Sequence, residues 1–140
     1  FMYRGTIMEA QAIAAYEFDR NVETMEAGFC LRDDRRAGCS PDRLVGEYGC
    51  LEIKCCSAPV HISALLGLEA QNHMSQCQGQ LWVTGRAWVD LYFYSPAFAP
   101  HIVRIERDGD YIDDLEKAVG EFCDRLDEAT ARLTRAEVAA

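Results

Sequence analysis

The spacing of apolar residues along the first third of the chain predicts a helix followed by strands. Within residues 4–18, apolar positions recur at steps of three and four, which places them on one face of a helix. Residues 22–31 are rich in strand-forming types and predict a β-strand, and the charged, glycine-containing stretch 32–38 predicts a turn. The chain therefore opens with one helix that leads into a sheet.

The middle of the chain carries a hairpin signal and then a second helix. Two short apolar runs, 43–45 and 50–55, flank a Gly-Glu-Tyr-Gly stretch, which is typical of a β-hairpin. The pattern of residues 59–68 fits either a short helix or a mobile loop. The remaining runs predict a helix at 70–83 and strands at 86–95 and 101–106.

The last predicted element is a long amphipathic helix over residues 110–135. Its apolar residues alternate steps of four and three and form one continuous stripe, made of Leu115, Val119, Phe122, Leu126, Ala129 and Leu133. The order helix, strands, helix, strands, helix predicts an α/β fold with a mixed central sheet flanked by helices. At 140 residues the chain suits a single domain, 1–140.

Composition narrows the function classes. The chain has 23 acidic and 14 basic residues, a net charge of −9, which excludes binding of nucleic acid through a broad basic surface. DNA can still be bound where a divalent cation lies between carboxylate and phosphate. No apolar run reaches the roughly 18 residues of a membrane span, and seven irregularly spaced cysteines without a CxxC pair indicate reduced thiols. We expect a cytoplasmic protein with no membrane partner.

The candidate chemistry lies in Ser40-Pro41-Asp42 and, ten residues later, Glu52-Ile53-Lys54. In a strand, Glu52 and Lys54 point to one face and their apolar neighbours to the other. Folding the hairpin about Glu47-Tyr48 is expected to bring Asp42 opposite Lys54 and diagonal to Glu52. Two carboxylates and a backbone carbonyl suit Mg²⁺ or Mn²⁺, and a nearby lysine can orient an attacking water.

This pattern alone has a simpler explanation. A D…ExK pattern is short and common, and a Glu/Lys pair on an edge strand is usually a surface ion pair. The order of the other motifs along the chain supports the catalytic interpretation of this pattern.

Five motifs, in order, resemble those of the lambda exonuclease / YqaJ-like viral recombinase family of PD-(D/E)xK nucleases. They are Arg4-Gly5…Glu9…Ala12…Tyr16-Glu17, Gly38-Cys39-Ser40-Pro41-Asp42, Leu51-Glu52-Ile53-Lys54-Cys55, Gln76-Cys77-Gln78 with Leu81-Trp82-Val83-Thr84, and Arg104-Ile105-Glu106-Arg107-Asp108. The resemblance covers nearly all of residues 4–133. It implies a restriction-endonuclease-like core with a long C-terminal helix.

The resemblance also implies roles for individual residues. Asp42 and Glu52, with the backbone carbonyl of Ile53, would bind the metal, and Lys54 would position the nucleophilic water. Glu9 would face the same metal, directly or through water; Glu17 matches the family less well. Gln76 would support the catalytic lysine or contact the scissile phosphate.

Three positions are weaker DNA-contact candidates. Gln78 lies off the Gln76 face of the predicted helix, Arg43 stands where the family usually has glycine, and His73 stands where it has tyrosine. Either Arg43 contacts a phosphate or the fold simply tolerates it there. The family's N-terminal segment, which grips the 5′-phosphate, has no counterpart in this sequence, so we expect the full-length protein to carry more residues upstream.

The function that the resemblance implies is a Mg²⁺-dependent 5′→3′ exonuclease on double-stranded DNA ends, in which Mn²⁺ can replace Mg²⁺. Such enzymes leave 3′ overhangs for a single-strand annealing protein in phage-type recombination, and the best-known members form homotrimers. The expected setting is a bacterial or phage-infected cell. Two alternatives stay open: an endonuclease or structure-specific nuclease on the same core, and a non-catalytic prophage module that binds DNA ends or a partner.

Overall fold

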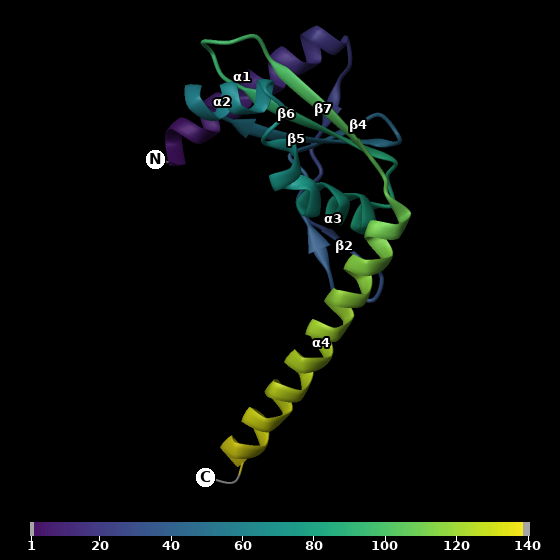
Figure 1. Ribbon diagram of the computed structural model, residues 1–140. Helices are drawn as coiled ribbons and strands as arrows, with labels where there is room; N and C mark the ends of the chain where they lie inside the picture. Colours follow the sequence, from purple (N-terminus) through teal and green to yellow (C-terminus); the bar gives the residue numbers. More distant parts are fainter. Residues whose placement is uncertain (1, 139–140) are drawn as a thin grey trace.

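The computed structural model describes residues 2–138, with side chains for residues 7–134 (Figure 1). The helices are α1 (Met2–Arg20), α2 (Ala58–Leu65), the 3₁₀ turn η1 (Ala70–His73), α3 (Met74–Thr84) and α4 (Gly109–Val138). The strands are β1 (Thr24–Met25), β2 (Cys30–Leu31), β3 (Gly38–Cys39), β4 (Arg43–Val45), β5 (Gly49–Cys55), β6 (Trp88–Tyr94) and β7 (His101–Glu106). The α/β class, the mixed sheet and the long last helix are as predicted.

Five strands form the main sheet in the order β1-β4-β5-β6-β7. β5 and β6 run parallel over seven paired residues, and the other neighbours are antiparallel. The connection from β5 to β6 passes through α2, η1 and α3, which is the crossover that a parallel pair requires. β2 and β3 pair separately as a two-stranded sheet.

The two faces of the sheet carry separate cores. On one face, β5 and β6 pack against α3, α2 and the start of α4, and this core includes Cys77, Leu81 and Phe93. On the other face they pack against α1, through Ala12 and Tyr16. The central strands β5 and β6 are therefore buried on both sides, so their polar residues are placed by tertiary contacts rather than by solvent.

The predicted strand over 22–31 is wrong as a single element. It divides into β1 and β2, which belong to different sheets. Gly28, between them, has a φ of +61°, a conformation that glycine adopts without strain and that turns the chain out of the first sheet. The ambiguous stretch 59–68 begins with helix α2 and ends in a turn at Gly67.

The β4–β5 hairpin has a register that differs from the prediction by two residues. Val45 pairs with Gly49, so the turn is centred on Glu47 rather than on Tyr48. Because Arg43 pairs with Leu51, the same register places Asp42 opposite Glu52 and not opposite Lys54. The two carboxylates are therefore closer neighbours than the sequence suggested.

Helix α4 leaves the body of the fold after its first few turns and extends away from it (Figure 1). Ile112 is buried and Leu115 and Val119 pack against the core, whereas Phe122 and Leu126 are more than half exposed. The apolar stripe is therefore continuous, but only its first part packs against the core. Among the described residues, no helix is long and apolar enough to span a membrane.

Candidate active site

Glu52 is the centre of a hydrogen-bonded cluster between β5 and α3. It is 4% exposed. Its Oε1 accepts hydrogen bonds from Lys54 Nζ at 2.7 Å and from Gln76 Nε2 at 2.8 Å. Lys54 Nζ also donates to Gln76 Oε1 at 2.9 Å. The structure thus brings together the glutamate, lysine and glutamine singled out from the sequence, in a closed triangle of contacts.

A fourth member of this cluster, Gln80, was missed in the sequence. Its Nε2 donates to the second carboxylate oxygen, Glu52 Oε2, at 2.6 Å, and the residue is 3% exposed. Gln80 lies four residues after Gln76, so both project from the same face of α3. That spacing is the signal that would have found it, since two glutamines one turn apart can hold the two oxygens of one carboxylate.

Asp42 lies immediately before β4, beside this cluster. Its Oδ2 accepts a hydrogen bond from the backbone N–H of Ile53 at 2.6 Å. The pKa of Asp42 is raised to about 6, chiefly by burial; the hydrogen bond from Ile53 opposes this shift, and the nearby carboxylates of Glu52 and Glu9 add to it. A carboxylate that is costly to ionise in a protein is one that a cation would stabilise.

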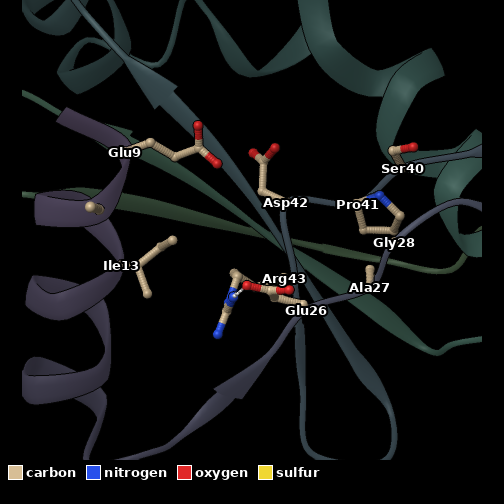
Figure 2. Close-up of a pocket in the computed structure, with 10 residues that line it drawn as sticks. Glu9, Ile13, Glu26, Ala27, Gly28, Ser40, Pro41, Asp42 and Arg43 are labelled. Carbon is tan, nitrogen blue, oxygen red and sulfur yellow. Dashed lines mark ion pairs between the residues drawn. The ribbon is translucent and has the colours of Figure 1, made fainter. Parts of the chain in front are cut away.

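A cavity of about 470 Å³ opens beside Asp42 (Figure 2). It is lined from α1 by Glu9 and Ile13, and from the sheet side by Asp42 and Arg43. Figure 2 shows the Glu9 carboxylate directed toward Asp42 across this space. Glu9 therefore faces Asp42 across the cavity, while Glu52 is not among the residues that line it.

Two of the three DNA-contact candidates are engaged in the fold itself. Arg43 donates to Thr24 Oγ1 and to the Thr24 carbonyl, both at 2.9 Å, and so joins β4 to β1. Gln78 is 1% exposed; its Nε2 donates to the Glu106 carbonyl and its Oε1 accepts from the Asp108 N–H. Both side chains are paired with protein groups, so each has a structural role in the fold.

His73 and Glu17 complete the set of candidates. His73 lies at the end of η1 with its ring 5.9 Å from that of Phe93, and burial and the nearby Lys54 ammonium lower its pKa. It therefore remains at the edge of the Glu52 cluster. Glu17 Oε1 accepts hydrogen bonds from the N–H and hydroxyl of Thr24, which is a structural role.

The donor set matches a hard divalent cation in part. Asp42, Glu52 and the Ile53 carbonyl offer oxygen atoms, which Mg²⁺ and Mn²⁺ prefer. No group of three or more His, Cys, Asp or Glu side chains suited to a metal occurs within the part of the chain that is described. Mg²⁺ usually keeps several waters and few protein ligands, so two carboxylates and a carbonyl are enough protein ligands for it.

Comparison with known proteins identifies the family of the chain. A model of the YqaJ-like viral recombinase domain matches residues 1–87, while no curated protein matches the chain. The crystal structure of an alkaline exonuclease, LHK-Exo, from Laribacter hongkongensis has a TM-score of 0.90 and 32% identity, covering 98% of this chain and 74% of that one. LHK-Exo in complex with dAMP gives the same score and identity, with 73% of that chain covered.

A more distant structure, SSO0001, has a TM-score of 0.53 and 19% identity, covering 84% of this chain and 58% of that one, so the likeness concerns the fold alone. The expected nuclease fold is confirmed by the closer pair of structures. On the matched family model and this overall likeness, the chain belongs to the YqaJ-like viral recombinase domain family.

Proposed function

We propose that the chain is a Mg²⁺-dependent exonuclease that degrades the 5′ strand of double-stranded DNA ends and leaves 3′ overhangs for phage-type recombination. The observation that carries the proposal is Lys54 Nζ held 2.7 Å from Glu52 Oε1, with Asp42 alongside at the open cavity. Family membership and the likeness to an alkaline exonuclease support nuclease chemistry. Polarity and overhang rest on the family resemblance.

In this proposal, Gln76 holds Lys54 in position, and Lys54 contacts the water or the phosphate. Gln76 Oε1 accepts a hydrogen bond from the Lys54 ammonium and Gln76 Nε2 donates one to Glu52, so Gln76 holds the lysine beside Glu52. Lys54 is 23% exposed and can donate its remaining proton to a water or to a phosphate oxygen. A divalent cation at Asp42 and Glu52 would supply Lewis-acid chemistry, which lowers the pKa of water and offsets phosphate charge.

Digestion of a 5′-phosphorylated linear duplex tests the proposal. With Mg²⁺, the full-length protein is expected to shorten the 5′ strand, whereas Lys54→Ala and Glu52→Ala leave the duplex intact. Strand-specific end labels report the polarity and the 3′ overhang. A duplex that survives wild-type protein and Mg²⁺, or that both variants digest normally, contradicts the proposal.

A covalently closed circle separates the exonuclease from the endonuclease alternative. An exonuclease requires an end, so the circle is expected to persist until a second enzyme linearises it. Cleavage of the intact circle would support an endonuclease on the same core. Titration with Mn²⁺ separates the enzyme from a non-catalytic module, because binding that is lost in Asp42→Asn requires a working metal site.

Partners follow from the same proposal. We expect double-stranded DNA ends as substrate, a homotrimer as the assembly and a single-strand annealing protein as the partner, in the cytoplasm of a bacterial or phage-infected cell. Light scattering of the full-length protein tests the trimer. Co-purification with a single-strand annealing protein tests the partnership, and a monomer that binds neither protein nor DNA ends would contradict this part of the proposal.

A further inference from the structure

Gln80 holds one oxygen of Glu52 from a site that solvent does not reach. Its Nε2 lies 2.6 Å from Glu52 Oε2, and it is 3% exposed. The other end of the same amide, Gln80 Oε1, is buried and has no hydrogen-bond partner among the described residues. An unpartnered buried acceptor costs roughly 1–3 kcal/mol, so a purely structural role would favour an apolar side chain at this position.

The neighbouring buried glutamine shows the contrast. Gln78, two residues earlier on α3, has both ends of its amide paired with backbone groups. The side chain of Gln80 makes one hydrogen bond among the described residues, and that bond goes to the carboxylate of Glu52, a metal ligand in the proposed function. Both ends of the Gln78 amide therefore have hydrogen-bond partners, whereas the amide oxygen of Gln80 has none among the described residues.

The opposite oxygen of Glu52 is already occupied. Lys54 and Gln76 both donate to Oε1, so without Gln80 the carboxylate would be held at one oxygen alone and would be free to rotate about its last torsion. The amides of Gln76 and Gln80 act on the two oxygens from consecutive turns of α3, which fixes the plane of the carboxylate.

We infer that Gln80 is a positioning residue that fixes the Glu52 carboxylate in the orientation needed to bind a divalent cation. The inference deepens the proposed function and rests on it. Loss of such an outer contact to a metal ligand typically weakens metal affinity about 10–100-fold. Gln80 itself touches neither metal nor DNA.

Calorimetric titration with Mn²⁺ alone tests this inference apart from activity. In Gln80→Met, which keeps the length of the side chain and removes the amide, we expect Mn²⁺ to bind about tenfold more weakly than in wild type. Gln80→Asn keeps the amide but is one methylene shorter, and it is expected to weaken binding similarly. The matched control is Gln78→Met, which removes a buried amide from the same helix and is expected to lower the melting temperature without changing Mn²⁺ affinity.

The outcomes separate the inference from the proposed function. Wild-type protein that binds no Mn²⁺ and digests no duplex contradicts the proposed function. Wild-type protein that does both, while Gln80→Met and Gln80→Asn bind Mn²⁺ within twofold of it, overturns the positioning role alone. An equal loss of affinity in the folded Gln78→Met control would also overturn it, because the effect would then come from the helix as a whole.

Discussion

Two buried carboxylates on adjacent strands, Glu52 on β5 and Asp90 on β6, are held in opposite ways. Asp90 is 1% exposed and receives two hydrogen bonds from Arg104, at 2.8 and 2.9 Å. Tyr16 on α1 donates a third, at 2.7 Å to Asp90 Oδ2. Glu52 is nearly as buried, but its donors are a lysine and two amides, and a second carboxylate lies beside it.

The two sites differ in how completely the charge of the carboxylate is balanced by its partners. The guanidinium fork of Arg104 matches the carboxylate of Asp90 in geometry and charge, and Arg104 in turn lies 3.7 Å from the ring centroid of Trp88. Nothing in that arrangement calls for a further cation. At Glu52, by contrast, the single charge of Lys54 faces two carboxylates, which leaves excess negative charge beside an open cavity. The first site stabilises the fold, whereas the second carries the negative charge that the cation of the proposed function would offset.

Removing the lysine should produce the largest effect. Lys54→Met removes the charge at the centre of the Glu52 cluster, and we expect nuclease activity to fall by about 10³-fold because a positioned proton donor typically contributes 10²–10⁴-fold. Time courses on a labelled linear duplex measure the loss, and circular dichroism verifies the fold. Retention of more than a tenth of the activity would place the chemistry elsewhere.

Removing the acid of the structural pair should act on stability instead. Asp90→Asn leaves Arg104 without its ionic partner, but Arg104 is 46% exposed and can be rehydrated, so we expect a loss of about 2 kcal/mol, below the usual cost for a fully buried pair. Urea unfolding measures the change. Activity per folded molecule should equal that of wild type, and a selective loss of activity would mean that the two carboxylates do not differ in role.

Asp42 gives a pH-dependent prediction. Its pKa is raised to about 6 in the folded protein, chiefly by burial, so the ionised carboxylate lowers stability above that pH. Stability from this group is greatest below its ordinary pKa of 3.8 and is lost as the pH rises through 6. In EDTA, Asp42→Asn should therefore melt at a higher temperature than wild type at pH 7.5, with the difference vanishing near pH 4. A melting temperature of Asp42→Asn below that of wild type at pH 7.5 would contradict this prediction.

The smallest expected effect concerns the tyrosine of the structural pair. Burial raises the pKa of Tyr16, so its hydroxyl stays protonated and donates to Asp90. Tyr16→Phe removes this one hydrogen bond, while Arg104 still satisfies both oxygens of Asp90, so we expect a loss of about 1 kcal/mol by urea unfolding. Mn²⁺ affinity should stay at the wild-type value, since Tyr16 lies on the opposite face of the sheet from the Glu52 cluster.

Local patterns predicted the elements well where they were long. The strand predicted at 101–106 coincides with β7, and the helix predicted at 110–135 lies within α4 and ends three residues before it, because the apolar stripe of that helix repeats over many positions. The prediction for 22–31 failed because two strands of two residues each are too short to show a period. The positive φ of Gly28, which separates the two strands, has no signature in the sequence pattern.

The sequence by itself determined which residues are candidates for the chemistry: Asp42, Glu52 and Lys54 were identified from their types and spacing, and Gln76 from the resemblance to the family. Only the tertiary structure decided how they meet. The hairpin register, set by a turn centred on Glu47, puts the two carboxylates opposite each other. The contacts of α3 with β5 and β7 decide that Gln80 serves Glu52 while Gln78 serves the backbone. Residue type fixes what a side chain can donate or accept, but the partner depends on packing between segments far apart in the chain.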